Sequence, residues 1–121
     1  MQAAEEIYVL TNEKGKYYVG STRKFDARML QHSRGMGSEW TKHHPMSFCI
    51  LRRPKIDAFD EDNTVKKYME EHGFANVRGG AYSQVVLTGP QLDFLLQEQR
   101  HRLRRCLECG GLGHFAKHCQ T

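Results

Sequence analysis

The chain contains 121 residues, which allows one globular domain and little more. Hydrophobic residues make up 39% and charged residues 26%, a composition that excludes a wholly disordered chain. The net charge of +4 is by itself weak support for a polyanionic partner. No apolar run approaches the roughly 20 residues of a membrane span, and the N-terminus does not resemble a signal peptide, so we expect an intracellular chain that does not enter membranes.

The hydrophobic pattern predicts a small α/β fold, in which a three-stranded sheet, mixed or antiparallel, is flanked by helices. Two strand-like runs around a short loop that contains Gly15 predict a β-hairpin. Gly73 is typical of a helix end and Pro90 of a helix start. The expected elements are strands at 7–10 and 17–19, a helix over 25–33, a polar loop over 34–45, a strand at 48–51, a helix from about 61 to 72, a short strand at 84–87 and a helix from 90 to about 105.

This pattern divides the chain into three expected segments. Residues 1–89 form a folded domain, 90–105 a basic amphipathic helix or linker, and 106–119 a cysteine-rich tail. Within the domain, Trp40 is expected to pack rather than to stack on a base. Cys49 lies in an apolar run and is expected to be a small buried side chain.

Two charge clusters bear on function. Arg100, Arg102, Arg104 and Arg105 form a dense basic run directly before the tail, and acidic residues gather between Asp57 and Asp62. A metal-dependent enzyme that acts on a phosphate backbone could carry both features. Charge alone favours two solvated surface patches, because most charge runs have no further role.

The tail has the spacing of a metal site. Cys106, Cys109, His114 and Cys119 follow the pattern Cys-x-x-Cys-x-x-x-x-His-x-x-x-x-Cys, and an intracellular chain argues against disulfides. Three thiolates and one imidazole complete a tetrahedral Zn²⁺ site with no open position, so the zinc would be structural. So short a segment cannot bury a core and would depend on the metal to fold. Chance spacing and a redox Cys-x-x-Cys pair are the alternatives.

The run Cys109-Gly110-Gly111-Leu112-Gly113-His114 resembles the CCHC zinc knuckle of retroviral nucleocapsid and cellular RNA-binding proteins. The resemblance implies a pocket for an unpaired base. Phe115 stands at the aromatic position of that pocket, and Leu107 replaces the other aromatic side chain. The arginines before the knuckle would add salt-dependent phosphate contacts.

A second motif spans the body of the chain. Its residues are Ile7-Tyr8, Tyr18-Val19-Gly20 followed by Ser21-Thr22, Arg28, His32, the segment Gly37-Ser38-x-x-Thr41, and Glu61. In this order they resemble the GIY-YIG nuclease superfamily over about residues 6–72. Glu6 stands where that family has its first glycine. The text of residues 68–82 is also similar to proteins of large DNA viruses and algae that join such a domain to a zinc knuckle.

The resemblance implies that Glu61 is the carboxylate for a catalytic Mg²⁺ or Mn²⁺, with substrate phosphate completing the site. Asp60 and Asp62 are the alternative ligands. From the residues alone, Glu61 is equally explained as a favourable acid at a helix N-terminus.

The same resemblance gives roles to four other side chains. Tyr18 would deprotonate the attacking water, which requires a pKa well below about 10. Tyr8 would position the water or the phosphate, and Arg28 would clamp the scissile phosphate. His32, one helical turn after Arg28, would orient the nucleophile or move a proton. Without the resemblance, the tyrosines are ordinary strand aromatics and His32 a structural hydrogen-bonding residue.

The leading hypothesis is a metal-dependent endonuclease, with DNA a better candidate substrate than RNA and cleavage guided by structure rather than strictly by sequence. A catalytically degenerate module that binds nucleic acid through the knuckle is the first alternative, and a protein-interaction adaptor is the second. Oligomeric state is left open. Thr22, Ser38, Thr41 and Lys42 are candidates for further phosphate or supporting contacts. The segment Arg78-Gly79-Gly80 is either another contact to the nucleic-acid backbone or a tight turn with a surface Arg.

Overall fold

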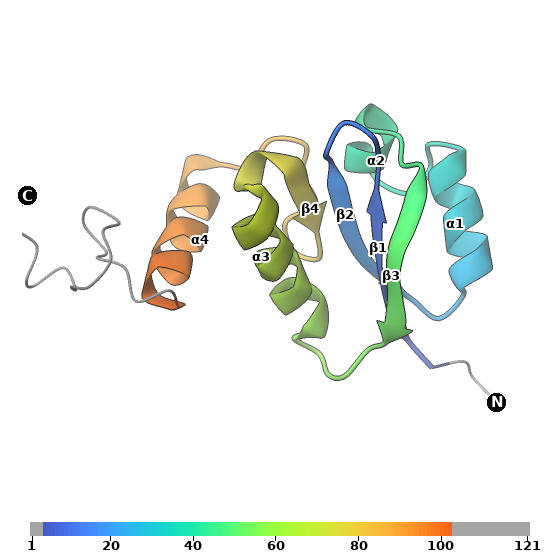
Figure 1. Cartoon of the computed structure of the whole chain (residues 1–121), viewed down its shortest axis with the longest axis horizontal. Helices are drawn as coiled ribbons and strands as arrows, with labels where there is room; N and C mark the ends of the chain where they lie inside the picture. Colours follow the sequence, from blue (N-terminus) through green and yellow to red (C-terminus); the bar gives the residue numbers. More distant parts are fainter. Residues whose placement is uncertain (1–3, 103–121) are drawn as a thin grey trace, which may run out of the picture. The chain divides into compact units, whose positions relative to one another are not determined.

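The structure is a computed structural model that describes residues 4–102 (Figure 1). The chain divides into two compact units, residues 1–86 and 87–121. Within the described part, none of the helices is both long and apolar enough to cross a membrane.

The first unit is built on a mixed sheet of four strands in the order β3-β1-β2-β4. The strands are β1 (Glu6–Thr11), β2 (Tyr17–Thr22), β3 (Phe48–Pro54) and β4 (Val77–Gly79). β1 pairs antiparallel with both β2 and β3, and β4 pairs parallel with β2. The hairpin and the third strand are confirmed, but the expected count of three strands is wrong, and no strand forms over 84–87.

Arg78 explains why the fourth strand lies at β4. Its side chain is buried and donates hydrogen bonds to the carbonyls of Gln84 at 2.7 Å and Val85 at 3.1 Å. Residues 84–87, which were expected to form a strand, instead supply two backbone carbonyls that accept hydrogen bonds from the Arg78 guanidinium. Arg78 also stacks over the Trp40 ring, 4.5 Å from its centroid. Arg78 is therefore neither a free phosphate contact nor a surface side chain, the two alternatives left open above, since it is buried and its donors are used inside the fold.

Helices cover both faces of the sheet. The helices of this unit are α1 (Phe25–Ser33), α2 (Glu39–His43), α3 (Asp60–His72) and the short 3₁₀ helix η1 (Phe74–Asn76). Side chains alternate between faces along a strand, so Tyr8, Leu10 and Tyr18 share one face and pack with Phe25 and Trp40, under α1 and α2. On the other face, Tyr17 of β2 contacts Tyr68 and His72 of α3.

Helix α2 was expected to be loop. It forms because the Ser38 hydroxyl accepts a hydrogen bond from the Thr41 backbone N–H, which caps the first turn. Trp40 is buried as expected. Cys49 is exposed on the edge strand β3, so the expectation that it is buried is wrong.

The second unit contains α4 (Gly89–Arg102), in agreement with the helix expected from residue 90. Thr88 and Gln91 form a reciprocal cap, in which each side chain accepts a hydrogen bond from the other residue's backbone N–H. Arg100 and Arg102 lie in its last turn. Arg104, Arg105, Phe115 and the four expected zinc ligands Cys106, Cys109, His114 and Cys119 lie outside the described residues.

Candidate active site

Tyr8 and Tyr18 lie together on the face that α1 covers. Their rings are 6.3 Å apart, measured between centroids. Gly20 is the partner of Tyr8 in the strand register, and a Cβ atom there would collide with the Tyr8 phenol oxygen. The glycine of the hairpin motif therefore makes the space in which the Tyr8 hydroxyl lies.

His32 binds Tyr8 from α1. Its Nε2 atom is 2.8 Å from the Tyr8 hydroxyl oxygen, and its Nδ1 atom is 3.1 Å from Thr41 Oγ1. A Cβ atom on Gly37 would occupy the position of the imidazole, so this glycine leaves room for the ring. Burial, together with the Arg28 charge, lowers the pKa of His32 to about 4. The imidazole is therefore neutral at physiological pH.

Arg28 lies one turn before His32 on the same helix and reaches the same phenol. Its Nε donates to the Tyr8 oxygen at 3.3 Å, while its two terminal nitrogens donate to the Gly37 carbonyl and the Gln31 side chain, each at 2.9 Å. The guanidinium is partly exposed, whereas Tyr8 is 0% exposed. The Tyr8 hydroxyl is therefore enclosed by Arg28, His32 and Gly20.

Both phenols are weaker acids than free tyrosine. Burial raises the pKa of Tyr8 to about 12, against the opposing hydrogen bond from Arg28. Burial also raises the pKa of Tyr18, again against the Arg28 charge. The expectation of a lowered Tyr18 pKa is therefore wrong for the free protein, because the desolvation of the ring outweighs the neighbouring cation.

Glu61 lies in the first turn of α3 and is partly buried. The Ser21 hydroxyl of β2 donates to its Oε2 atom at 2.8 Å, which ties this carboxylate to the end of the tyrosine hairpin. The negative charge of Glu61 adds to the factors that raise the pKa of both Tyr8 and Tyr18, so it lies within electrostatic reach of the two phenols.

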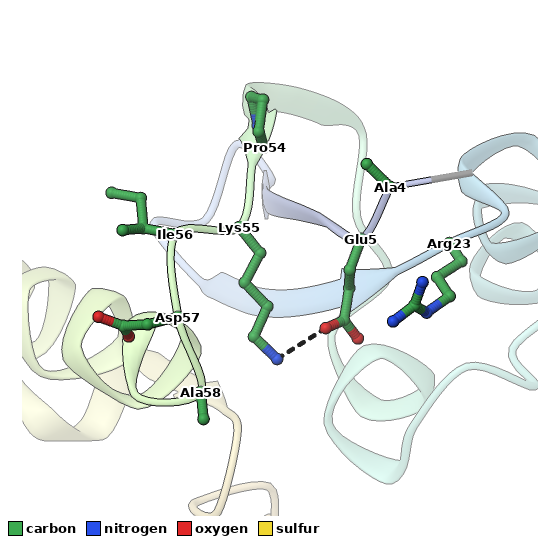
Figure 2. A pocket seen from close by; sticks show the side chains of 8 residues that line it. All are labelled: Ala4, Glu5, Arg23, Pro54, Lys55, Ile56, Asp57 and Ala58. Carbon is green, nitrogen blue, oxygen red and sulfur yellow. Dashed lines mark ion pairs between the residues drawn. The ribbon is translucent and has the colours of Figure 1, made fainter. Parts of the chain in front are cut away.

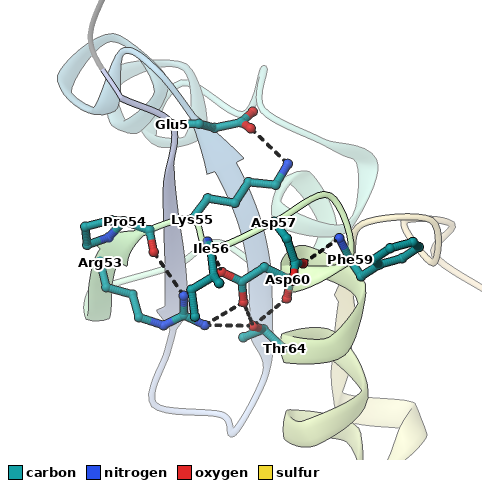
Figure 3. A network of polar contacts seen from close by, with 9 residues as sticks. All are labelled: Glu5, Arg53, Pro54, Lys55, Ile56, Asp57, Phe59, Asp60 and Thr64. Carbon is teal, nitrogen blue, oxygen red and sulfur yellow. Dashed lines mark hydrogen bonds and ion pairs between the residues drawn. The ribbon is translucent and has the colours of Figure 1, made fainter.

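The two neighbouring aspartates have structural roles instead. Asp60 accepts two hydrogen bonds from Arg53, at 2.7 and 2.8 Å, and one from the Ile56 backbone N–H (Figure 3). The Arg53 guanidinium holds the pKa of Asp60 far below its usual range. Asp62 accepts from the Ala81 backbone N–H at 2.9 Å. Of the three acids in this turn, Glu61 is the one whose carboxylate accepts a hydrogen bond from β2.

Two cavities share Glu5 and Arg23 in their walls. One has a volume of about 420 Å³, and Figure 2 shows the ion pair between Lys55 Nζ and Glu5 Oε1, at 2.9 Å, in its wall with Arg23 beside Glu5. The other has a volume of about 410 Å³ and reaches Arg28. Its lining residues are Glu5, Thr22, Arg23, Lys24, Ala27, Arg28 and Gln31. This second cavity is basic, because its lining contains three cationic side chains, Arg23, Lys24 and Arg28, and one acidic side chain, Glu5.

A metal at Glu61 would find few protein ligands. Among residues 4–102, no group of three His, Cys, Asp or Glu side chains is arranged to hold a metal ion. Glu61 and the Ser21 hydroxyl are both hard oxygen donors, and Mg²⁺ commonly binds through one or two carboxylates and keeps the rest of its shell for water and phosphate. The donor set therefore fits a weakly held Mg²⁺ or Mn²⁺ that substrate completes.

The β1–β2 hairpin carries the two phenols, and α1 carries Arg28 and His32. Residues 6–59 match the family model of the GIY-YIG catalytic domain. The GIY-YIG family is one of nucleases. Comparison with curated proteins and with solved structures found no significant match, which leaves the expected likeness to viral and algal proteins without support. Glu61 lies just beyond the matched residues.

Glu6, at the position of the first motif glycine, forms an ion pair with Arg52 across the sheet. Arg52 donates to both Glu6 oxygens, at 2.7 and 3.0 Å, and its guanidinium lies over the Phe25 ring. This departure from the GIY-YIG pattern is therefore accommodated by a partly exposed ion pair.

The structure brings Tyr8, Tyr18, Arg28 and His32 together, and it shows partners for which no role was predicted. Ser21 bonds Glu61, and Lys55 and Arg23 line the cavities. Ser21 directly follows the motif glycine, which is the signal that could have marked it. Lys55 carries no such signal, because its place beside Glu5 depends on how β3 pairs with β1.

Proposed function

We propose that this protein is a metal-dependent nuclease that hydrolyses phosphodiester bonds, with DNA as its substrate. The observation that carries the proposal is the Tyr8 hydroxyl, which His32 and Arg28 bond at the same time. This group joins a proton acceptor, a permanent cation and a hydroxyl, which are the parts that an attack by water on a phosphate requires.

Arg28 would bind the scissile phosphate. Its planar guanidinium suits a phosphate oxygen pair, and the basic cavity beside it adds Arg23 and Lys24 for the flanking backbone. In the free protein Arg28 covers Tyr8. A phosphate that draws the guanidinium outward would open the phenol to water, so substrate binding and exposure of Tyr8 are coupled in this account.

The proton of the attacking water would pass through Tyr8 to His32. Tyr8 accepts a proton from water while its own proton passes to His32 Nε2, which lies 2.8 Å from the hydroxyl oxygen, so Tyr8 stays neutral and His32 becomes an imidazolium. No tyrosinate forms, which agrees with a Tyr8 pKa of about 12. The negative phosphate beside Arg28 would raise the pKa of His32 from its value in the free protein and help it to hold the proton.

Glu61 and Ser21 would hold the Mg²⁺ or Mn²⁺ ion. When bound, such an ion would polarise a phosphate oxygen and stabilise charge on the leaving oxygen. Glu61 itself keeps this position because Ser21 fixes its Oε2 atom and because Asp60, the preceding residue, anchors the start of α3 through Arg53.

The basic helix end and the tail would hold nucleic acid. Arg100, Arg102, Arg104 and Arg105 would contact phosphates, and Phe115 would stack on a base in a Zn²⁺ knuckle formed by Cys106, Cys109, His114 and Cys119. These contacts favour single-stranded or distorted substrates, since a stacked base must leave its duplex.

A cleavage assay tests the proposal. Wild type, Glu61→Gln and Glu71→Gln are incubated with single-stranded, duplex, flapped and branched DNA and matched RNA, in EDTA, Mg²⁺ or Mn²⁺. Glu71 is the matched control, because it is an exposed acid on the same helix α3. We expect cleavage only with a divalent ion, lost in Glu61→Gln and kept in Glu71→Gln. Cleavage that survives in Glu61→Gln would contradict the metal assignment.

A nucleic-acid-binding module without catalysis is the second candidate. The enclosed Tyr8 hydroxyl and the raised pKa values of both phenols favour it, because they describe a site closed to water in the free protein. It predicts binding of the same substrates with no cleavage under any metal condition. Retained binding without cleavage in the wild type would therefore replace the first proposal with this one.

A further inference from the structure

We propose that Thr41 is a positioning residue that fixes the His32 tautomer, so that Nε2 is free to accept the Tyr8 proton. This inference rests on the proposed function for its catalytic meaning. The tautomer itself follows from hydrogen bonds in the described structure and can be measured without any cleavage.

Arg28 determines which way the Tyr8 hydroxyl points. A guanidinium only donates, so the Tyr8 oxygen accepts the bond from Arg28 Nε. The proton of the Tyr8 hydroxyl is then directed to the other atom in contact with it, His32 Nε2 at 2.8 Å. Nε2 must accept this bond, and it must therefore carry no proton.

The neutral imidazole consequently carries its proton on Nδ1, where the partner is Thr41 Oγ1 at 3.1 Å. Thr41 can act as the acceptor because its own hydroxyl can donate a hydrogen bond to Ser38. The Ser38 carbonyl lies 3.2 Å from Thr41 Oγ1, and the Ser38 hydroxyl lies 3.0 Å away. The resulting chain runs in one direction, from Tyr8 through His32 and Thr41 to Ser38.

The fold holds Thr41 in this orientation. Thr41 is 1% exposed, so water does not compete for its hydroxyl. Its backbone N–H donates to Ser38 Oγ at 3.1 Å in the capped first turn of α2, which fixes the residue against the imidazole. Without the Thr41 oxygen, the buried Nδ1–H would lose its acceptor, and the alternative tautomer with a proton on Nε2 would be favoured. That tautomer cannot accept the Tyr8 proton.

The test is the ¹⁵N NMR tautomer pattern of His32 in the full chain, assigned by its loss in His32→Gln. We expect the Nδ1–H form in the wild type, a shift toward the Nε2–H form in Thr41→Val, and recovery of the Nδ1–H form in Thr41→Ser. Thr64→Val is the matched control, because Thr64 is also buried and hydrogen-bonded but lies on α3. It is expected to leave the His32 pattern unchanged.

Activity provides a second measurement. We expect Thr41→Val to lower kcat by roughly 10²-fold with KM unchanged, and Thr41→Ser to restore it. Should Thr41→Val fail to fold, Thr41→Cys keeps the volume with a poorer acceptor and is expected to show a mixture of tautomers. An Nε2–H form in the wild type, or an Nδ1–H form in Thr41→Val, would overturn the proposal. The NMR result stands even if no substrate is cleaved, so failure of this proposal is distinct from failure of the nuclease.

Discussion

At the scale of single residues, the Tyr8 hydroxyl organises the site, because it forms hydrogen bonds with both functional side chains of α1 that the motif predicts, Arg28 and His32. The motif indicated this grouping. Alternation along β1, together with the hairpin register that pairs Leu10 with Tyr18, puts Tyr8 and Tyr18 on one face. The four-residue spacing puts Arg28 and His32 on one side of a helix. The direction of the phenol pKa shifts was not predictable, since a sequence shows neighbouring charge but not the extent of burial.

His32 makes the stability of the fold depend on pH. Its pKa falls from an ordinary 6.5 to about 4 on folding, so the unfolded state binds the proton more tightly and stability falls as pH falls through this range. We expect the wild type to lose about 2–3 kcal/mol more than His32→Gln between about pH 7.5 and about pH 4.5. Urea unfolding at each pH measures this difference. Equal losses in the two proteins would contradict the buried neutral imidazole.

At the scale of elements, the start of α3 depends on the bonds between Arg53 of β3 and Asp60. Breaking a mostly buried ion pair leaves the remaining charge without compensation. We expect Arg53→Met to lower the free energy of unfolding by about 1–3 kcal/mol, a range reduced because a third of the Arg53 side chain is exposed. Arg52→Met, in an exposed pair on the same strand, is the matched control and should change stability much less. Equal effects on denaturant unfolding would argue against this anchor.

The elements that the sequence did not predict are short and depend on tertiary contacts. Helix α2 has five residues and forms around the Ser38 cap and buried Trp40. Strand β4 has three residues and pairs parallel with β2, a partner sixty positions away in the Tyr17–Val77 pairing. The long amphipathic helices were predicted closely, because their periodic patterns and end signals lie within one continuous segment of sequence.

At the scale of the whole molecule, binding of nucleic acid should depend on the basic cavity beside Arg28. Each phosphate contact that is removed lowers the slope of log affinity against log salt by about 1. Arg23→Gln with Lys24→Gln should therefore weaken DNA binding and reduce this slope by about 1–2 in fluorescence anisotropy titrations in EDTA. Lys14→Gln with Lys67→Gln, which removes two exposed lysines that do not line the cavity, should leave the slope unchanged. Equal slopes for the wild type and the cavity variant would show that DNA binds elsewhere.

The tail is expected to depend on zinc. About one equivalent of Zn²⁺ should bind per chain and be lost in a Cys106→Ser, Cys109→Ser variant, because a closed tetrahedral site needs all four ligands. Metal analysis after exhaustive dialysis measures this, and the affinity for single-stranded DNA should fall together with zinc content. A wild-type protein that binds no zinc would contradict the predicted zinc knuckle. The basic cavity beside Arg28 would then be the main candidate surface for binding DNA.

Single-turnover cleavage by Tyr8→Phe, compared with Tyr17→Phe, tests the central claim most directly. Each change removes one hydroxyl from a strand tyrosine, but Tyr17 lies on the opposite face and stacks on His72, away from the proposed site. We predict that Tyr8→Phe lowers the cleavage rate by about 10²–10⁴-fold while DNA affinity is kept, because the proton path to His32 is lost. Tyr17→Phe should cleave like the wild type. Cleavage by Tyr8→Phe at the wild-type rate would contradict the proposed active site.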